Sequence, residues 1–262
     1  MIELKNIGII FAEGTPDENI ALKNISLTIN KGDFITVIGS NGAGKSTLYN
    51  IIAGSLQPTS GSITLDGNDI TREPEYKRAH YIGRIFQNPL LGTVGKMSLE
   101  DNMIICEKKG YKGLKISLNR KKREQFRQQL AVLGMGLEDR LTDNVEQFSG
   151  GQRQALTLLM AVMSHPSLLL LDEHTAALDP ANAEVVMNLT RRFAEEYNLT
   201  VMMITHNMNH ALAYGNRLLM MDAGEIIMDL SGEEKSKLTA DAVVERFRQI
   251  KQGALSDALL LH

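Results

Sequence analysis

The sequence predicts an α/β fold in which a mostly parallel sheet is covered by helices, with an antiparallel β subdomain and an inserted helical subdomain. Three observations predict it: short apolar strands alternate with helical segments, the N-terminal part is rich in strands, and strand signals vanish between about Pro89 and Met160. Alternating strands and helices are typical of a parallel sheet with both faces covered. A chain of 262 residues is long enough to form one large domain of this kind.

The N-terminal elements are predicted in the following order. Residues 2–11 and 20–29 have strand character on either side of the turn-rich stretch EGTPDEN. Residues 34–39, FITVIG, are predicted to form a buried strand that runs into a glycine-rich loop, and the helix that follows should stop at Gly54. Residues 61–70, GSITLDGNDI, are expected to form a hairpin with its turn at Asp66-Gly67.

The middle of the chain is expected to be helical, because residues 98–110 and 118–135 have helical spacing. The basic cluster of residues 120–127 could suggest a nucleic-acid patch, but we interpret it as the solvated face of a helix. That interpretation depends on an apolar stripe in the same segment, which consists of Leu118, Phe126, Leu130 and Leu133.

Two further buried strands are predicted at SLLLLDE, residues 167–173, and TVMMITH, residues 200–206, with a helix from about Ala181 to Tyr197 between them. The C-terminal part has helical spacing through Leu238, Val243 and Phe247 and is expected to pack on the main domain with a loose tail. We therefore expect one domain over 1–262, with a β-rich core (1–88 and 161–230), a helical subdomain (89–160) and a C-terminal helical tail (231–262).

Composition excludes several classes of protein. Cys106 is the one cysteine, so no intrachain disulfide is possible, which fits a reducing compartment. The net charge of −3 gives no support to a nucleic-acid partner. The N-terminal MIELKNIGII lacks the pattern of a signal peptide, and no window reaches the length of a membrane span. If the protein works at a membrane, it must therefore use the membrane span of a partner.

The stretch GSNGAGKST, residues 39–47, matches the pattern G-x-x-x-x-G-K-[ST] between a predicted strand and a predicted helix. The glycines allow backbone N–H groups to curl around phosphates, and the helix N-terminus adds its positive end. Lys45 should reach the β- and γ-phosphates, and the Ser46 hydroxyl should bind Mg²⁺. The predicted nucleotide-binding residues are Gly39, Ser40, Asn41, Gly42, Ala43, Gly44, Lys45, Ser46 and Thr47. An ordinary glycine-rich turn is the alternative.

A carboxylate pair ends the leucine run LLLLDE. Charge is costly beside an apolar run unless something compensates it. A strand that delivers Asp172 to the sheet edge would hold the other side of a phosphate-bound magnesium ion. Glu173 is then expected to orient or deprotonate the attacking water as a general base. The alternative, a strand end capped by exposed acids, explains one acid better than a pair.

A second glycine-containing loop, the Ser-Gly-Gly stretch of FSGGQ at 148–152, also leads into a helix. It predicts a second anion-binding helix start. One γ-phosphate does not need two such sites from one chain. Two chains in head-to-tail register would set the loop of one against the ATP of the other across a two-fold interface. His206 follows a strand directly, where an imidazole could contact the terminal phosphate, although a lone histidine is more often structural.

Together these stretches resemble the nucleotide-binding subunit of ATP-binding cassette (ABC) transporters over almost the whole chain. GSNGAGKST resembles the Walker A loop, FSGGQ the LSGGQ signature with Phe148 in place of leucine, and LLLLDE is similar to Walker B followed by the catalytic glutamate. AALD resembles the D-loop. The resemblance implies a P-loop NTPase core with an inserted helical signature subdomain.

The resemblance also implies roles for particular residues. Gln87 in GRIFQNP matches the glutamine that senses magnesium and contacts the permease, and His206 matches the switch histidine. Phe11 stands where the family stacks an aromatic ring on adenine, although a plain core phenylalanine is the alternative. Asp179 is implied to lie near the subunit interface. The expected cofactors are ATP and Mg²⁺, the latter held by Ser46, Gln87 and Asp172, and the signature residues expected to contact ATP are Ser149, Gly150, Gly151 and Gln152.

His174 departs from the usual family pattern, because most relatives carry proline or alanine after the glutamate. DEHTAALDP resembles a smaller bacterial subgroup of uptake systems that use a solute-binding protein, with aromatic amino acids as one substrate class. His174 could add a titratable group beside Glu173, but we favour a tolerated side chain at a strand-to-loop turn.

The resemblance implies a homodimer around two ATP molecules, driving a separate transmembrane permease at the cytoplasmic face of the cell membrane. Import is favoured because no membrane domain is fused to the chain. Two alternatives remain: a soluble ABC ATPase without a transport role, such as the ATPase of iron–sulfur cluster assembly, and a nucleotide-binding regulator without turnover. The regulator is disfavoured because Glu173 and His206 are both present.

Overall fold

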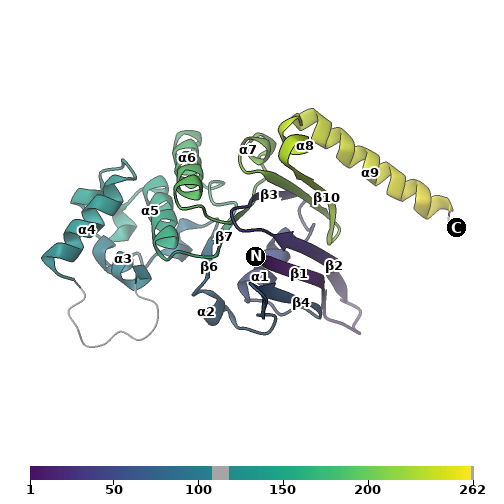
Figure 1. The fold of residues 1–262 in the computed structure, drawn as a ribbon, viewed down its shortest axis with the longest axis horizontal. Helices are drawn as coiled ribbons and strands as arrows, with labels where there is room; N and C mark the ends of the chain where they lie inside the picture. Colours follow the sequence, from purple (N-terminus) through teal and green to yellow (C-terminus); the bar gives the residue numbers. More distant parts are fainter. Residues whose placement is uncertain (108–117, 261–262) are drawn as a thin grey trace. The chain divides into compact units, whose positions relative to one another are not determined.

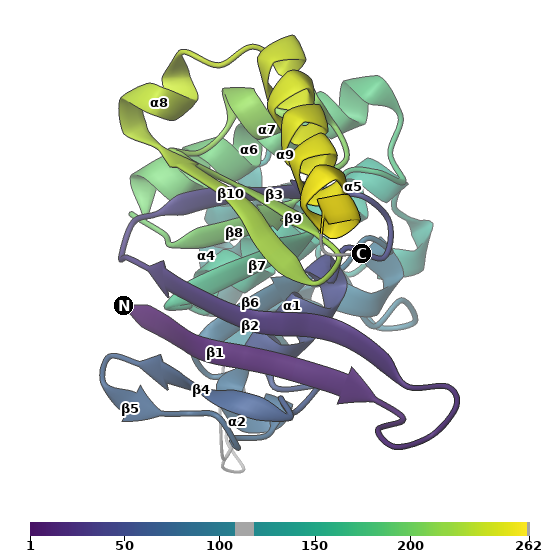
Figure 2. The ribbon, with the colours of Figure 1, turned by 90° about the vertical axis from the view of Figure 1, so that its right-hand side faces the viewer.

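The computed structural model describes residues 1–107 and 118–260, with the side chains of 1–107 and 118–250. Most of its helices and strands are labelled in Figure 1, and the others in Figure 2. The chain divides into two compact units. The first unit comprises Met1–Ile52, Leu56–Arg72 and the chain from Met203 onward, and the second comprises Ala53–Ser55 and Glu73–Met202.

An antiparallel sheet of the first unit has the strand order β2-β1-β4-β5 (Figure 2). Its strands are β1 (Ile2–Phe11), β2 (Asn19–Ile29), β4 (Ser60–Leu65) and β5 (Asn68–Asp69). In β1, Ile2 pairs with Ile29 on one side and with Leu65 on the other. The predicted hairpin turn is confirmed, since Asp66 and Gly67 have φ values of 47° and 83°, as a type I′ turn requires.

The other sheet of the first unit contains the strand that precedes the glycine-rich loop. Strand β3 (Phe34–Gly39) is parallel to β9 (Arg217–Asp222), which forms an antiparallel hairpin with β10 (Glu225–Ser231). Strand β8 (Val201–Ile204) crosses the boundary between the units, because its first two residues belong to the second unit and its last two to the first. The sequence predicted β3 and β8, although β8 is shorter than TVMMITH, and it did not resolve β9 and β10.

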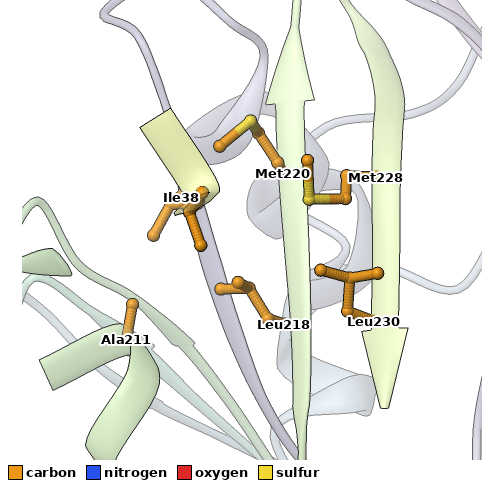
Figure 3. Packing of buried hydrophobic residues seen from close by; sticks show 7 residues of the cluster. Ile38, Ala211, Leu218, Met220, Met228 and Leu230 are labelled. Carbon is orange, nitrogen blue, oxygen red and sulfur yellow. The ribbon is translucent and has the colours of Figure 1, made fainter. Parts of the chain in front are cut away.

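The core of the first unit beside β9 and β10 is aliphatic and rich in methionine (Figure 3). It consists of Ile38, Ala211, Leu218, Met220, Met228, Leu230 and Val243. The helices of this unit are α1 (Lys45–Ala53), α7 (Met208–Ala213), α8 (Gly232–Ser236) and α9 (Ala240–Leu260). Leu238 and Phe247 pack against the same core, so the prediction that the C-terminal helix packs on the main domain is confirmed. Residues 261–262 lie outside the described residues.

The second unit combines parallel strands with most of the helices. Strand β6 (Ile82–Ile85), which the sequence did not reveal, is parallel to β7 (Leu168–Asp172). The helices are α2 (Glu75–Arg78), α3 (Leu99–Glu107), α4 (Arg120–Ala131), α5 (Gly150–Met163) and α6 (Pro180–Glu196), with short 3₁₀ turns at Pro89–Gly92, Leu137–Asp139 and Val145–Gln147. In the described parts of residues 89–160 there is no strand, only an isolated bridge between Ser98 and Asn144, as the sequence predicted.

Helix α4 has the solvated basic face that the sequence predicted. Phe126, Leu130 and Leu133 are buried, whereas Arg123 and Arg127 are exposed. Leu118 is only half-buried and precedes the helix, because Asn119 caps its N-terminus by accepting a hydrogen bond from the backbone of Lys122. The predicted helix at 98–110 is observed as α3, and residues 108–110 lie outside the described residues.

The expected boundaries of a helical subdomain at 89–160 and a tail at 231–262 stay predictions, since the two compact units divide the chain at other points. Across residues 1–107 and 118–260, no helix is both long and apolar enough to cross a membrane.

Candidate functional site

The glycine-rich loop connects β3 to α1 within the first unit, and two of its glycines are sterically required. Gly39 has φ +151°, and a Cβ there would lie 2.2 Å from the carbonyl oxygen of Met221. Gly44 has φ +97°, and its Cβ would lie 2.8 Å from the carbonyl oxygen of Ala21. Only glycine fits such close approaches of backbone to backbone. The loop is therefore held between neighbouring strands in a fixed shape.

Charged and polar groups of the loop are already engaged within the first unit. The Lys45 side chain is 6% exposed, and its Nζ donates to the carbonyl oxygens of Gly39 and Ser40, both at 2.8 Å. The Ser40 hydroxyl donates to Asp222 Oδ1 at 3.0 Å. Because α1 begins at Lys45, the N–H groups of its first turn lack intrahelical acceptors and suit an anion.

Most of the remaining loop residues are exposed or half-buried, as contact with a ligand requires. Ser46, in the first turn of α1, is exposed, and Thr47 beside it is half-buried. Asn41 and Gly42 are exposed at the tip of the loop, whereas Ala43 is buried.

Two more predicted residues belong to the first unit. Phe11 ends β1 and is 39% exposed, so it is not a core phenylalanine. His206 is exposed and follows β8 by two residues. The backbone N–H of its neighbour Thr205 donates to the carbonyl oxygen of Val37 at 3.2 Å, so His206 lies beside the strand that leads into the glycine-rich loop.

Three predicted residues share one sheet edge in the second unit. Strands β6 and β7 are parallel with Ile85 opposite Leu171, so Gln87 and Asp172 both emerge at the carboxyl edge. Gln87 is exposed in the loop after β6. The sequence predicts that Glu173 continues the strand. In the structure Glu173 has φ +48°, and the strand ends one residue earlier, at Asp172. A left-handed conformation in a residue other than glycine is uncommon and costs free energy, which marks this position for attention.

His174 is more than a tolerated side chain at a turn. It is 2% exposed, and its Nε2 lies 3.1 Å from the Thr190 hydroxyl of α6. That hydroxyl donates its hydrogen to the carbonyl oxygen of Val186 at 2.8 Å, so the imidazole Nε2–H must be the donor to Thr190. The histidine connects the loop after β7 to α6.

The signature loop and the predicted interface aspartate lie side by side in the second unit. Ser149 caps α5 in a reciprocal capping box with Gln152. A Cβ on Gly151 would lie 2.5 Å from Asn182 Oδ1, so the start of α5 is packed directly on the start of α6. Asp179 caps α6 and accepts hydrogen bonds from the side chain and backbone of Asn182, which hold the pKa of Asp179 below its ordinary value.

Sequence reasoning missed two residues of these arrangements, Arg84 and Asn182. Asn182 fixes the distance between the two helix starts, and Arg84 is an ion-pair partner of Asp172. Each is next to a motif rather than inside one. A lone arginine within the otherwise apolar stretch IGRIF, directly before Gln87, was the sequence signal that could have indicated Arg84.

The predicted site residues thus fall into two groups, one on each unit. The first unit holds the glycine-rich loop, Phe11 and His206, and the second holds Gln87, Asp172, Glu173, Asp179 and residues 149–152. A strand, a phosphate-binding glycine loop and a helix in an α/β sheet define the class of P-loop nucleotide-binding proteins.

Comparison with known proteins defines the family. The sequence profile of the family described as "ABC transporter" matches residues 22–176, more than half of the chain. The chain is 42% identical over 248 residues to the tyrosine transport ATP-binding protein of Clostridioides difficile (strain R20291), covering 94% of this chain and 98% of that protein. The chain therefore belongs to the ABC transporter family, as an ATP-binding subunit whose ATPase activity is coupled to transport.

Other relatives agree with this assignment. The chain is 34% identical to the phosphonates import ATP-binding protein PhnC of Lactobacillus acidophilus (strain ATCC 700396 / NCK56 / N2 / NCFM), covering 90% of this chain and 91% of that protein. A solved dimer of the ATP-binding cassette MJ0796, in a post-hydrolysis state bound to ADP and phosphate, matches with a TM-score of 0.73 and 28% identity, covering 88% of this chain and 98% of that chain. These relatives are transport components, so the iron–sulfur assembly alternative receives no support from them.

Proposed function

We propose that this chain is the ATP-hydrolysing subunit of a bacterial importer for tyrosine or another aromatic amino acid. It would act at the cytoplasmic face of the cell membrane, bound to a separate permease that receives solute from a solute-binding protein. The observation that carries the proposal is the near full-length similarity to a tyrosine transport ATP-binding protein. The histidine-containing stretch DEHTAALDP, which we associate with solute-binding-protein-dependent uptake, supports it further.

ATP binding is assigned to the glycine-rich loop of the first unit. Residues 39–47 would surround the phosphates with backbone N–H groups, and Lys45 would exchange its carbonyl acceptors for phosphate oxygens. That exchange replaces hydrogen bonds to neutral oxygens by stronger bonds to charged ones. The exposed ring of Phe11 offers a face for adenine.

The residues assigned to magnesium fit this ion chemically. Ser46, Gln87 and Asp172 would supply hydroxyl, amide and carboxylate oxygens, the donors that Mg²⁺ prefers. Among the described side chains of residues 1–107 and 118–250, no three or more of His, Cys, Asp or Glu gather into a metal site. The three assigned residues suit an ion that is held by a few protein oxygens together with substrate phosphates and water. When bound, magnesium would neutralise charge on the phosphates.

Hydrolysis is assigned to Glu173 as the general base and to His206 as a contact of the terminal phosphate. Glu173 would accept a proton from the attacking water, and Gln87 would help to orient that water. The left-handed backbone at Glu173 supports this role, because strained positions are often found in active sites.

A second copy of the chain is expected to complete the site. Ser149 is exposed at the N-terminus of α5, where the helix dipole favours an anion, and Gly150, Gly151 and Gln152 form the first turn. We propose that this turn contacts ATP bound to the other copy, with Asp179 near the interface. Shifting a dimer equilibrium from 1:99 to 99:1 takes about 5.5 kcal/mol of differential affinity. Charge-assisted hydrogen bonds from the N–H groups of a helix start to phosphate oxygens are interactions that can supply this difference in affinity.

The permease is proposed to bind the second unit beside the loop that carries Gln87. A groove of about 370 Å³ there is lined by residues that include Glu75, Ala79, Phe86, Ile105 and Cys106. In the loop that follows Gln87, Leu90 and Leu91 expose 50% and 65% of their surface, an unusual cost for leucines in water. An amphipathic cytoplasmic helix of a membrane protein is the occupant whose chemistry suits this surface.

The test of this mechanism is the variant Glu173→Gln. We expect it to lose nearly all ATP turnover and to retain ATP binding, because the amide keeps the shape of the side chain but cannot accept the proton. Labelled nucleotide should report the binding, because the chain has no tryptophan. Size exclusion with ATP should show a dimer that the wild type loses on hydrolysis. Wild-type turnover in this variant would remove Glu173 from the base role.

A further inference from the structure

The side chain of Arg84 is one that no motif of the sequence explains. It lies on β6, two residues before Phe86 and three before Gln87, and only 15% of it is exposed. Burying a guanidinium is costly unless ion pairs and hydrogen bonds compensate for the lost water.

The contacts of Arg84 are longer than ideal hydrogen bonds, but each joins the guanidinium to a specific group. Its Nη2 lies 3.8 Å from Asp172 Oδ2, close enough for an ion pair but too far for a hydrogen bond. Its Nη1 donates to the Ser55 hydroxyl at 3.4 Å, and its buried Nε has no hydrogen-bond partner among the described residues. The guanidinium carbon lies 4.6 Å from the centroid of the Phe86 ring, a cation–π contact.

One planar cation therefore lies near groups from both strands of the same sheet edge. On one side is the carboxylate that ends β7, and on the other is the ring that directly precedes Gln87. Because this contact is longer than a hydrogen bond and is not a bidentate pair, Arg84 itself does not take up a coordinating position on the carboxylate. Arg84 can thus fix the position of Asp172 without occupying its coordinating oxygens.

We propose that Arg84 is a positioning residue that couples the loop of Gln87 to Asp172, so that the two residues present their oxygens to magnesium as one unit. This inference rests on the proposed function of that edge. Removing the guanidinium leaves both residues in the chain but breaks the side-chain link between the Phe86 ring and the Asp172 carboxylate. Magnesium affinity should fall, whereas nucleotide affinity without metal, which depends on the other unit, should not.

The experiment measures binding of a labelled, non-hydrolysable ATP analogue with and without Mg²⁺, and Mn²⁺ binding by electron paramagnetic resonance. In Arg84→Met we expect the gain in nucleotide affinity from metal to fall by about tenfold or more, as for other residues that orient metal ligands. Arg84→Lys should be intermediate, because lysine keeps the charge but loses the planar stack. The matched control is Arg127→Met, which removes an arginine from the exposed face of α4 and should equal the wild type.

Several results would overturn the inference. Arg84→Met with the metal dependence of the wild type would do so, as would Arg84→Lys equal to the wild type, since stacking would then have no role. A loss of melting temperature with unchanged metal dependence would reduce Arg84 to a structural residue. If the wild type itself gains no nucleotide affinity from magnesium, the proposed magnesium site fails and the inference fails with it.

Discussion

His174 carries information at the scale of single residues, because the family resemblance gave it no role and the structure gives it a hydrogen bond. Its buried Nε2–H donates to Thr190, whose own hydrogen is used by Val186. A buried N–H group that loses its acceptor lowers the free energy of unfolding. The histidine therefore fixes the segment that follows the carboxylate pair.

Thr190→Val should cost about 1–3 kcal/mol of unfolding free energy, because it leaves the imidazole N–H buried without its acceptor. Urea denaturation measures the loss. Thr190→Ser keeps the hydroxyl and should be milder, and the pair His174→Phe with Thr190→Val should be less destabilised than the sum of its single changes. Strict additivity would show that the hydrogen bond has no energetic role.

Lys235 gives a pH-dependent prediction. Its ammonium donates to the carbonyl oxygens of Tyr214 and Gly215 at the end of α7, and burial lowers its pKa to about 8. Between pH 8 and 10.5 the unfolded chain therefore binds more protons at this site than the folded chain does. The contribution of Lys235 to stability should rise with pH across this window and be lost as the pH falls through 8.

The measurement compares urea denaturation of the wild type with that of Lys235→Met at several values of pH. The difference in unfolding free energy should move in favour of the wild type as the pH rises from 8 to 10.5. A difference that does not change with pH would contradict the lowered pKa.

At the scale of elements, the starts of α5 and α6 form one packed unit. The Cβ of an alanine at position 151 would meet Asn182 at 2.5 Å, and Asn182 is held in place by Asp179. Gly151→Ala should therefore cost about 1–3 kcal/mol, as overpacking usually does. In an Asn182→Gly background, which also removes the Asn182 Cβ that would lie 2.9 Å away, the same change should be neutral or stabilising, because alanine is the better helix former. An equal cost in both backgrounds would show that the clash is not the cause.

Elements with a strong local signal could be predicted from the sequence. The strand over residues 34–39 and the Asp66-Gly67 hairpin have the apolar run or turn residues that determine them. Strand β6 lacks that advantage, because IGRI contains a glycine and a charged residue and its strand exists through pairing with β7. Strand β9 does contain an apolar run, Leu218–Met221, which we did not assign to a strand from the sequence. Likewise, nothing local predicts that β7 ends at Asp172 rather than at Glu173.

At the scale of the whole molecule, the candidate site could be predicted where it is written in contiguous stretches. The glycine-rich loop, the carboxylate pair and the Ser-Gly-Gly helix start were all readable because each motif contains its own chemistry. Residues whose role depends on contact with another element could not be identified from the sequence. Arg84 contacts Asp172 across 88 positions of sequence, and Asn182 contacts Gly151 across 31. Tertiary packing alone brings such pairs together.

The central claim is that ATP hydrolysis by this chain drives uptake of an aromatic amino acid. The most direct measurement is uptake of radiolabelled tyrosine by cells from which the chain has been deleted, after restoring either the wild type or Glu173→Gln at equal expression. We predict saturable uptake with the wild type, reduced by excess phenylalanine, and background uptake with Glu173→Gln. Two results would contradict the claim: equal tyrosine uptake with the wild type and with Glu173→Gln, or undiminished tyrosine uptake in cells that lack the chain.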